Sequence, residues 1–343
     1  MEVRHETPFV TDLSEVIDKD GSLARVAVLK ATFEVADNGT LQVAEEQEPV
    51  CIADEWLADP GMSSTMYESD GAYFKVATDI VVSGKAYAPL GRPTQSCLAG
   101  LSVGPLAKTV LVFGDRSWSY TAIFGARMSA PTPFVEMPLC WERAFGGYDG
   151  FQNAPVKQMD RRNPIGTGFR VTESVEALDG LALPNFEDPV ERIRSWNSKP
   201  PPRGFGFIGR DWLPRVQYAG TYDAAWQRDR MPIPPVDFDD RFFNAAPSDQ
   251  IYPGYLQGGE VVRAVNLSEK GEEVFVLPRV EVKFRGVARS KPFAIRARLD
   301  TAVFQLDKRR AILTWRGKYN VALDESAEDI RADVVSLDHS SRT

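Results

Sequence analysis

Histidine is nearly absent from this chain, and its scarcity limits the catalytic chemistry that we expect. The 343 residues include only His5 and His339, each close to an end of the sequence. A Ser-His-Asp or Cys-His arrangement requires a histidine held by a rigid shell, and terminal segments rarely provide one. A histidine-ligated metal is disfavoured for the same reason. We therefore expect no histidine-based catalysis, no metal and no other cofactor.

Cysteine is also scarce. Cys51, Cys97 and Cys140 are odd in number, lie far apart and include no CxxC pair. This pattern argues against a disulfide framework and a zinc site, and it fits a reducing compartment. Each thiol is predicted to be a small buried hydrophobe. Cys140, beside Trp141, is the thiol that we would test for reactivity.

Long apolar runs and positive charge are missing as well. No run approaches the roughly 18 residues that span a bilayer, and the first residues lack the apolar core of a signal peptide. The net charge is −8 and the isoelectric point about 5.1. Nucleic acid and anionic membranes both attract clustered positive charge. We therefore expect a cytoplasmic protein that binds neither nucleic acid nor membrane.

The two ends of the chain have the patterns of β-strands. Residues 23–35 and 40–43 flank Asn38-Gly39, a strong hairpin signal because both residues tolerate positive φ. Residues 280–286 alternate apolar and charged side chains, as a half-buried strand does. Further strands are predicted at residues 79–87, 98–103, 108–113, 260–267, 273–277, 294–300, 301–306 and 311–315.

The middle of the chain, residues 131–257, contains 16 of the 24 prolines. Segments this rich in proline do not fit inside helices or central strands, because proline lacks the backbone N–H that both require. Short helical turns are predicted at residues 189–196 and 239–245. We predict a mainly β fold, with two packed sheets or a partly closed barrel built from residues 1–130 and 258–323 around this irregular middle. Residues 1–323 are expected to form one large domain, followed by a flexible tail at 324–343.

Six carboxylates in the middle are candidates for acid–base chemistry. A pair of them flanked by aromatic rings is one arrangement of a glycosidase. The alternative is that they brace turns and pair with nearby arginines, such as Arg143, Arg161, Arg162, Arg215 and Arg241. We favour bracing, because acidic residues near arginines are common in such loops. The six are Glu142, Glu187, Asp223, Asp237, Asp239 and Asp240.

Two other motifs are better explained by structure than by ligands. The acidic run 237–240 lacks the glycine and the final glutamate of an EF-hand loop, and an aspartate there fits a helix N-cap. The pairs Gly166/Gly168 and Gly204/Gly206 lack the spacing of a phosphate-binding loop. Close packing of backbone against aromatic rings is the favoured interpretation.

Seven ordered motifs resemble the bacterial family called domain of unknown function 2169. They are WERAFGGYDG (141–150), NPIGTGF (163–169), LPNFEDP (183–189), GFGFIGRDWLPR (204–215), AGTYDAAW (219–226), DFDDRFFNAAPSDQ (237–250) and LQGGE (256–260). KVATDIVVSGKAYAP (75–89) and GDRSW (114–118) resemble its amino-terminal signatures. The resemblance implies a non-catalytic cytosolic adaptor or chaperone of type VI secretion. Such a protein binds a toxic effector and promotes its loading onto the spike protein (VgrG).

Under this interpretation the motif residues build a scaffold. Trp141, Glu142, Arg143 and Asn163 are then expected to be largely buried and hydrogen-bonded or packed. Two alternatives stay open: a carboxylate-dependent glycan or peptide hydrolase, and a carbohydrate- or peptide-binding module. The motifs assign no partner-binding residue. The expected structural residues are Trp141, Glu142, Arg143, Gly146, Gly147, Asn163, Pro164, Gly166, Gly168, Asn185, Glu187, Gly204, Gly206, Trp212, Arg215, Gly220, Tyr222, Asp223, Trp226, Asp237, Asp239, Arg241, Asn244, Gly259 and Glu260.

Overall fold

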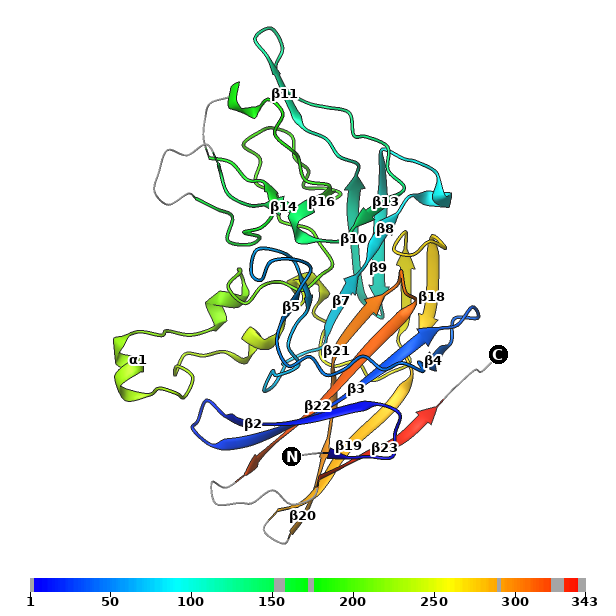
Figure 1. The fold of residues 1–343 in the computed structure, drawn as a ribbon, viewed down its shortest axis with the longest axis vertical. Coiled ribbons are helices and arrows are strands. Elements are labelled where there is room, and N and C mark those ends of the chain that lie inside the picture. Colours follow the sequence, from blue (N-terminus) through cyan, green and yellow to red (C-terminus); the bar gives the residue numbers. More distant parts are fainter. Residues whose placement is uncertain (1–2, 151–157, 172–175, 289–290, 322–329, 339–343) are drawn as a thin grey trace.

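A six-stranded sheet crosses the middle of the molecule (Figure 1). The computed structural model describes residues 3–150, 158–171, 176–288, 291–321 and 330–338. The longest strand, β3, is buried along nearly its whole length, as its dense Val, Ala and Phe content predicts. The sheet order is β2 (Val10–Ile17), β3 (Leu23–Val35), β22 (Arg310–Val321), β21 (Arg298–Gln305) and β7 (Asp79–Ser83), with β4 (Leu41–Val43) also on β3.

A five-stranded antiparallel sheet packs on one side of this central sheet. Its strands alternate buried and exposed side chains, so one face meets the core and the other faces solvent. Phe275 and Phe304 join the two sheets edge to face, with ring centroids 5.6 Å apart. The order is β16 (Phe186–Glu187), β10 (Leu106–Phe113), β9 (Ser96–Val103), β17 (Val261–Val265) and β18 (Glu272–Val276).

A third sheet of four strands lies below β22 in Figure 1. Its order is β1 (Val3–Arg4), β23 (Ile330–Asp338), β19 (Arg279–Ala288) and β20 (Lys291–Arg296). The predicted flexible tail is therefore wrong for residues 330–338, since β23 pairs with β19 over most of its length. Ile330 and Ala332 are buried, so this part of the tail adds to the core.

The remaining described residues form short ladders and turns. The ladders pair β5 (Glu55–Trp56) with β6 (Thr65–Tyr67), β8 (Lys85–Tyr87) with β13 (Glu136–Pro138), β11 (Trp118–Thr121) with β12 (Gly125–Met128), and β14 (Phe145–Gly146) with β15 (Thr167–Gly168). The one α-helix among the described residues is α1 (Ala224–Asp229). Short 3-10 turns lie at Pro89–Gly91, Trp141–Arg143, Glu176–Leu178, Arg215–Tyr218, Asp240–Phe243 and Ser248–Gln250.

The mainly β class with an irregular middle is confirmed, and the helical turn predicted at 239–245 is the 3-10 turn Asp240–Phe243. The helical turn predicted at 189–196 is wrong, because that segment has only bends and turns. Three open sheets share the core, where two packed sheets or a partly closed barrel were expected. In the described part of the chain, no helix is long and apolar enough to cross a membrane.

Candidate functional site

Trp141 is the centre of the irregular middle. Its side chain is buried, and its indole Nε1 donates a hydrogen bond to the carbonyl of Phe207 at 2.7 Å. Its ring meets Trp212 edge-on, with centroids 5.9 Å apart. Gly204 passes so close that an added Cβ would lie 3.0 Å from the Trp141 ring, and Gly206 also borders it. These two glycines therefore allow the backbone to approach an aromatic ring.

Glu142 and Arg143 each contact neighbouring loops. The Glu142 carboxylate accepts a hydrogen bond from the Ser64 backbone N–H at 2.9 Å and another from its hydroxyl. Arg143 Nη1 donates to Asp115 at 3.1 Å and to the Asn185 side chain at 3.0 Å. Both side chains are half-buried rather than largely buried. The pair joins three segments that are distant in the sequence.

Asn163 closes the loop that follows Trp141. It is fully buried, and its Nδ2 donates to the carbonyls of Trp141 at 2.8 Å and Phe145 at 3.1 Å. Gly146 has a φ of 149° and lies directly against Asn163, so an added Cβ would be 2.2 Å from the Asn163 carbonyl oxygen. In the same loop an added Cβ would lie 2.1 Å from the nearest atom at Gly147, 2.4 Å at Gly166 and 3.1 Å at Gly168. Pro164 is half-buried.

Glu187 is the most deeply buried of the six candidate carboxylates. It forms an ion pair with the buried Arg116, and its second oxygen accepts the Ile193 N–H at 3.2 Å. Burial lowers the pKa of Arg116, although Glu187 opposes this effect. Arg192 Nε also lies 3.8 Å from Glu187, so removing Glu187 leaves the buried Arg116 without its ion-pair partner, whereas removing Arg116 leaves Glu187 with Arg192.

The four aspartates lie at turns and helix starts. Asp223 caps α1 by accepting from Trp226 N at 2.8 Å, and Asp239 caps the turn Asp240–Phe243 by accepting from Arg241 N at 2.9 Å. Asp237 accepts from the Thr221 N–H at 2.9 Å and its hydroxyl at 2.7 Å, which lower the Asp237 pKa. Gly220, at φ 80°, forms the turn beside it, and Asp240 pairs with Lys19 at 2.8 Å.

Three more motif residues form hydrogen bonds or ion pairs between neighbouring segments. Asn244 Nδ2 donates to Ala77 O and to Asp79 Oδ1, both at 2.9 Å. The buried Arg215 guanidinium donates to Ile208 O at 2.7 Å and pairs with Glu68. Glu260 accepts from Gln257 N at 2.9 Å, beside Gly259 at φ 91°. Among the described residues, no group of three His, Cys, Asp or Glu side chains is close enough to hold a metal ion.

Two of the three cysteines, Cys51 and Cys97, are buried as predicted, whereas Cys140 is only half-buried. Burial raises the pKa of Cys51, Cys97 and Cys140 to about 11. Near Cys140, the charge of Glu142 adds to this effect. Thiolate is the reactive form of cysteine, so the position of Cys140 beside Trp141 does not distinguish it from the other two thiols.

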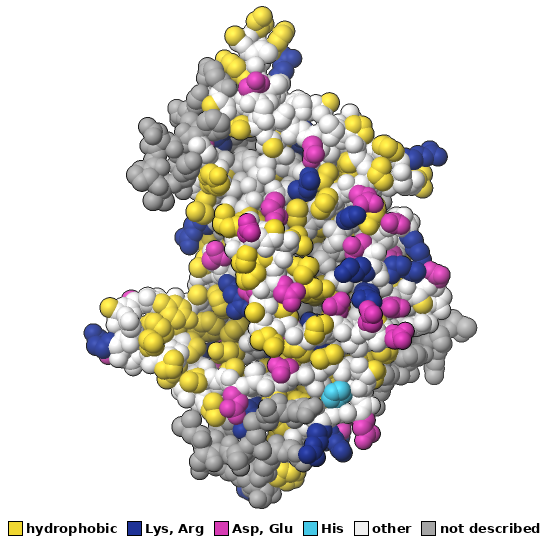
Figure 2. Space-filling model, in the orientation of Figure 1, with side chains coloured by type: hydrophobic (Ala, Val, Ile, Leu, Met, Phe, Trp, Pro, Cys, Tyr) yellow, Lys and Arg dark blue, Asp and Glu magenta, His cyan; other side chains and the backbone are white. Residues whose placement is uncertain are grey.

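The β11–β12 hairpin projects from the end of the molecule (Figure 1). At its base Trp118 is buried among Phe145, Leu178 and other apolar side chains. At its tip Ile123 is 86% exposed and Phe124 is 61% exposed. Figure 2 shows hydrophobic side chains gathered at this tip. The base therefore anchors a tip that offers apolar side chains to solvent.

A second projection, which we call the α1 arm, comprises residues 219–239. Tyr222 packs edge-on against Trp226, with centroids 4.6 Å apart, and Trp226 Nε1 donates to Ile233 O at 2.8 Å. These contacts fix the arm, yet Tyr222, Met231 and Val236 remain exposed. Hydrophobic side chains cover this arm in Figure 2. It lies apart from the hairpin tip, so these are two separate apolar projections within the described residues.

A comparison with family models matches residues 20–316 to the group described as uncharacterized protein conserved in bacteria (DUF2169). The chain belongs to the DUF2169 family. Comparisons with curated proteins and with solved structures give no match. The DUF2169 match spans the braced loops and both projections, and it ends inside β22.

The sequence interpretation missed a set of buried ion pairs in this DUF2169 protein. Lys30 pairs with Asp70 at 3.0 Å and Lys75 with Asp79 at 2.7 Å, and all four side chains are at least nine-tenths buried. The available signal was a charged residue inside a largely apolar strand, as Lys30 is in β3. Such a residue requires a buried partner, but the pattern does not say which one.

Proposed function

We propose that this protein is a non-catalytic cytoplasmic adaptor of type VI secretion that binds a toxic effector and promotes its loading onto the spike protein (VgrG). The resemblance of the seven motifs supplies the identity of these partners. The observation that carries a protein-binding role is the pair of apolar projections, the β11–β12 tip and the α1 arm, on a heavily braced scaffold.

The exposed side chains of both projections are of the kinds that dominate protein interfaces. Aromatic residues and methionine are enriched there, and a few such anchors supply most of the binding energy. The tip presents Ile123 and Phe124, and the arm presents Tyr222, Met231 and Val236. Leaving these side chains in water is unfavourable, and a partner surface would relieve that cost.

The projections are also held in place before any partner binds. Arg230 donates hydrogen bonds to Pro234 O within the arm and to Lys19 O outside it. At the hairpin, Tyr120 N donates to Asp179 at 2.9 Å. An interface that is already ordered loses less conformational entropy on association. The braces around Trp141 thus support binding, and the adaptor role assigns no reaction to the six carboxylates.

Co-expression with the neighbouring toxin and spike genes, followed by pull-down through a tag on this chain, tests the proposal. We expect both partners to be recovered. The double variants Ile123→Ser/Phe124→Ser and Met231→Ser/Val236→Ser should each lose at least one partner. Ile52→Ser is the matched control, because Ile52 is 87% exposed but lies on neither projection. Recovery of neither toxin nor spike by the unaltered chain would reject the adaptor role.

A further inference from the structure

The last residues of β22 have one unpaired edge. β21 begins at Arg298, which pairs with Arg316, whereas β22 continues to Val321 beside β3. Val35 N donates to Arg309 O, and the β3–β22 register runs without a shift. Along an antiparallel strand, successive residues direct their backbone N–H and C=O groups alternately to one neighbouring strand and to the other. Because Arg309 bonds to β3, the odd-numbered residues of β22 all direct these groups to β3. The N–H and C=O groups of Lys318 and Asn320 point the other way, where β21 has ended.

The residues that precede β21 do not fill this edge. At Ala297, one residue before β21 begins, the backbone already belongs to another sheet. Ala297 N donates to Val282 O at 2.9 Å, so the preceding strand β20 belongs to the four-stranded sheet. That sheet packs over the face of β22 at Gly317, where an added Cβ would lie 2.8 Å from Phe284. In the part of the chain that the structure describes, no strand pairs with β22 on the open side beyond Arg316.

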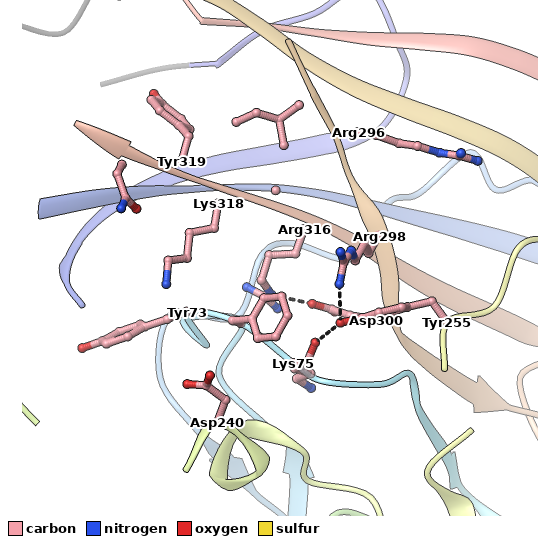
Figure 3. A pocket seen from close by; sticks show the side chains of 14 residues that line it. Tyr73, Lys75, Asp240, Tyr255, Arg296, Arg298, Asp300, Arg316, Lys318 and Tyr319 are labelled. Carbon is pink, nitrogen blue, oxygen red and sulfur yellow. Dashed lines mark hydrogen bonds and ion pairs between the residues drawn. The ribbon is translucent and has the colours of Figure 1, made fainter. Parts of the chain in front are cut away.

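A cavity of about 450 Å³ occupies this edge (Figure 3). Its walls are Arg316 to Asn320 of β22, Ile295 and Arg296 of β20, and the aromatic residues Tyr73, Phe74 and Tyr255. In Figure 3 Tyr73 and Asp240 lie across the cavity from Lys318 and Tyr319. The cavity therefore combines aromatic rings with a strand edge, and an extended peptide can use both in binding.

Most charges around the cavity are already compensated. Lys75 pairs with Asp79 at 2.7 Å, Arg316 pairs with Asp300 at 2.6 Å, and Lys318 pairs with Asp18. Each of these cations would therefore have to exchange an existing partner before it could hold a ligand carboxylate.

Arg298 is the exception. It is exposed and forms no ion pair with the described residues. Its Nη1 donates to the Tyr255 hydroxyl at 3.0 Å, and its guanidinium lies 4.7 Å from the Tyr255 ring centroid and 5.6 Å from that of Phe74. The rings position the guanidinium, and its other N–H groups match the geometry of a carboxylate. Such a free, oriented cation favours an anionic ligand group.

We propose that this cavity binds the carboxyl-terminal segment of a protein partner as an added antiparallel strand on β22. An added antiparallel strand would continue the line of β21 in its direction, so its last residue would meet Arg298. Its terminal carboxylate then pairs with the Arg298 guanidinium, while Lys318 and Asn320 supply backbone hydrogen bonds. A parallel strand would instead place a positive amino terminus against Arg298. This inference deepens the proposed adaptor function, and it rests on that function only in requiring a protein partner.

The test uses the full chain and a displayed library of random octapeptides with free carboxyl termini. We expect enrichment of peptides that, once synthesised with fluorescein, bind in an anisotropy assay. Amidation of the carboxyl terminus should weaken binding at least tenfold, and Arg298→Gln should do the same. Arg298→Lys should give an intermediate loss, since it keeps the charge but not the fork. Arg263→Gln on β17, an exposed strand arginine outside the cavity, should change affinity less than twofold.

N-methylation of successive peptide positions tests the strand geometry without altering the protein. Binding should be lost at alternate positions only, because every second N–H of an added strand faces β22. No enrichment, or selected peptides that bind equally as amides and to Arg298→Gln, would overturn the proposal. Recovery of toxin and spike with either result leaves the adaptor role standing. Peptide binding without their recovery rejects that role but not this site.

Discussion

Asn163→Ala tests the bracing of the central loop most directly. The substitution removes the two N–H donors of a fully buried amide and leaves the carbonyls of Trp141 and Phe145 without that partner. The Trp141 carbonyl still accepts from Ala144 N at 3.0 Å, so its loss is that of one hydrogen bond, about 0.5–1.5 kcal/mol. An unsatisfied buried carbonyl at Phe145 costs about 1–3 kcal/mol, so the free energy of unfolding should fall by about 1.5–4.5 kcal/mol in all. The cavity left by the amide adds to this loss, because surrounding atoms relax only partly.

The assay is equilibrium unfolding in urea, followed by tryptophan fluorescence because Trp141 and Trp212 adjoin the site. Asn197→Ala is the control: Asn197 is exposed, so its loss should change the free energy of unfolding by less than about 0.5 kcal/mol. Asn163→Asp should be at least as destabilising as the alanine variant, because it also introduces a buried charge. A loss below about 1 kcal/mol in Asn163→Ala would refute the reasoning that these two bonds hold the loop.

Three further outcomes are expected. Gly146→Ala should unfold the protein or prevent its soluble expression, because its Cβ would collide with the Asn163 carbonyl, whereas Gly61→Ala, with open space around it, should remain soluble. Native Cys140 should react with iodoacetamide about tenfold faster for each pH unit up to its pKa of about 11, while the urea-unfolded chain should level off near pH 9. A plateau at pH 9 in the native protein would contradict the raised pKa of Cys140. Asp223→Ala should lower the free energy of unfolding by about 0.5–2 kcal/mol, because it removes the α1 cap. It should also weaken recovery of a partner bound by the α1 arm, but not of one bound only by the β11–β12 tip. Equal losses of both partners would show that the effect is global.

Local patterns in the sequence predicted most of the strands correctly. The alternation at 280–286 is matched by burial of Val280, Val282 and Phe284 in β19, and Gly39 has the positive φ that the hairpin required. These signals succeed because they depend on neighbours in the chain. The break predicted between residues 300 and 301 is wrong, since β21 is continuous there with a register shift after Leu299. The buried partner of Asp300, Arg316, is remote in sequence, so the local pattern does not show that Asp300 lies inside a strand.

The predicted tail failed for a related reason. The tail at 324–343 is acidic and then serine-rich, which suggested a frayed end. They form β23 because β19 and β1, from opposite ends of the chain, pair with its two edges. Strand formation here depends on partners that local propensity does not reveal.

In the candidate site too, the sequence identified the important residues but not the residues that they contact. Motif residues such as Trp141, Glu142 and Asn163 were identified from sequence, but the Ser64 contact of Glu142 spans 78 positions in the chain. The Glu142 carboxylate therefore already accepts hydrogen bonds from the Ser64 N–H and hydroxyl.

Five of the six candidate carboxylates accept a backbone N–H in this way, and Asp240 instead pairs with Lys19. Using any of them as an acid or base would weaken a local brace, so loss of activity and loss of folding would coincide. The open edge of β22 differs in this respect, because Arg298 can exchange solvent for a ligand carboxylate without breaking an existing ion pair.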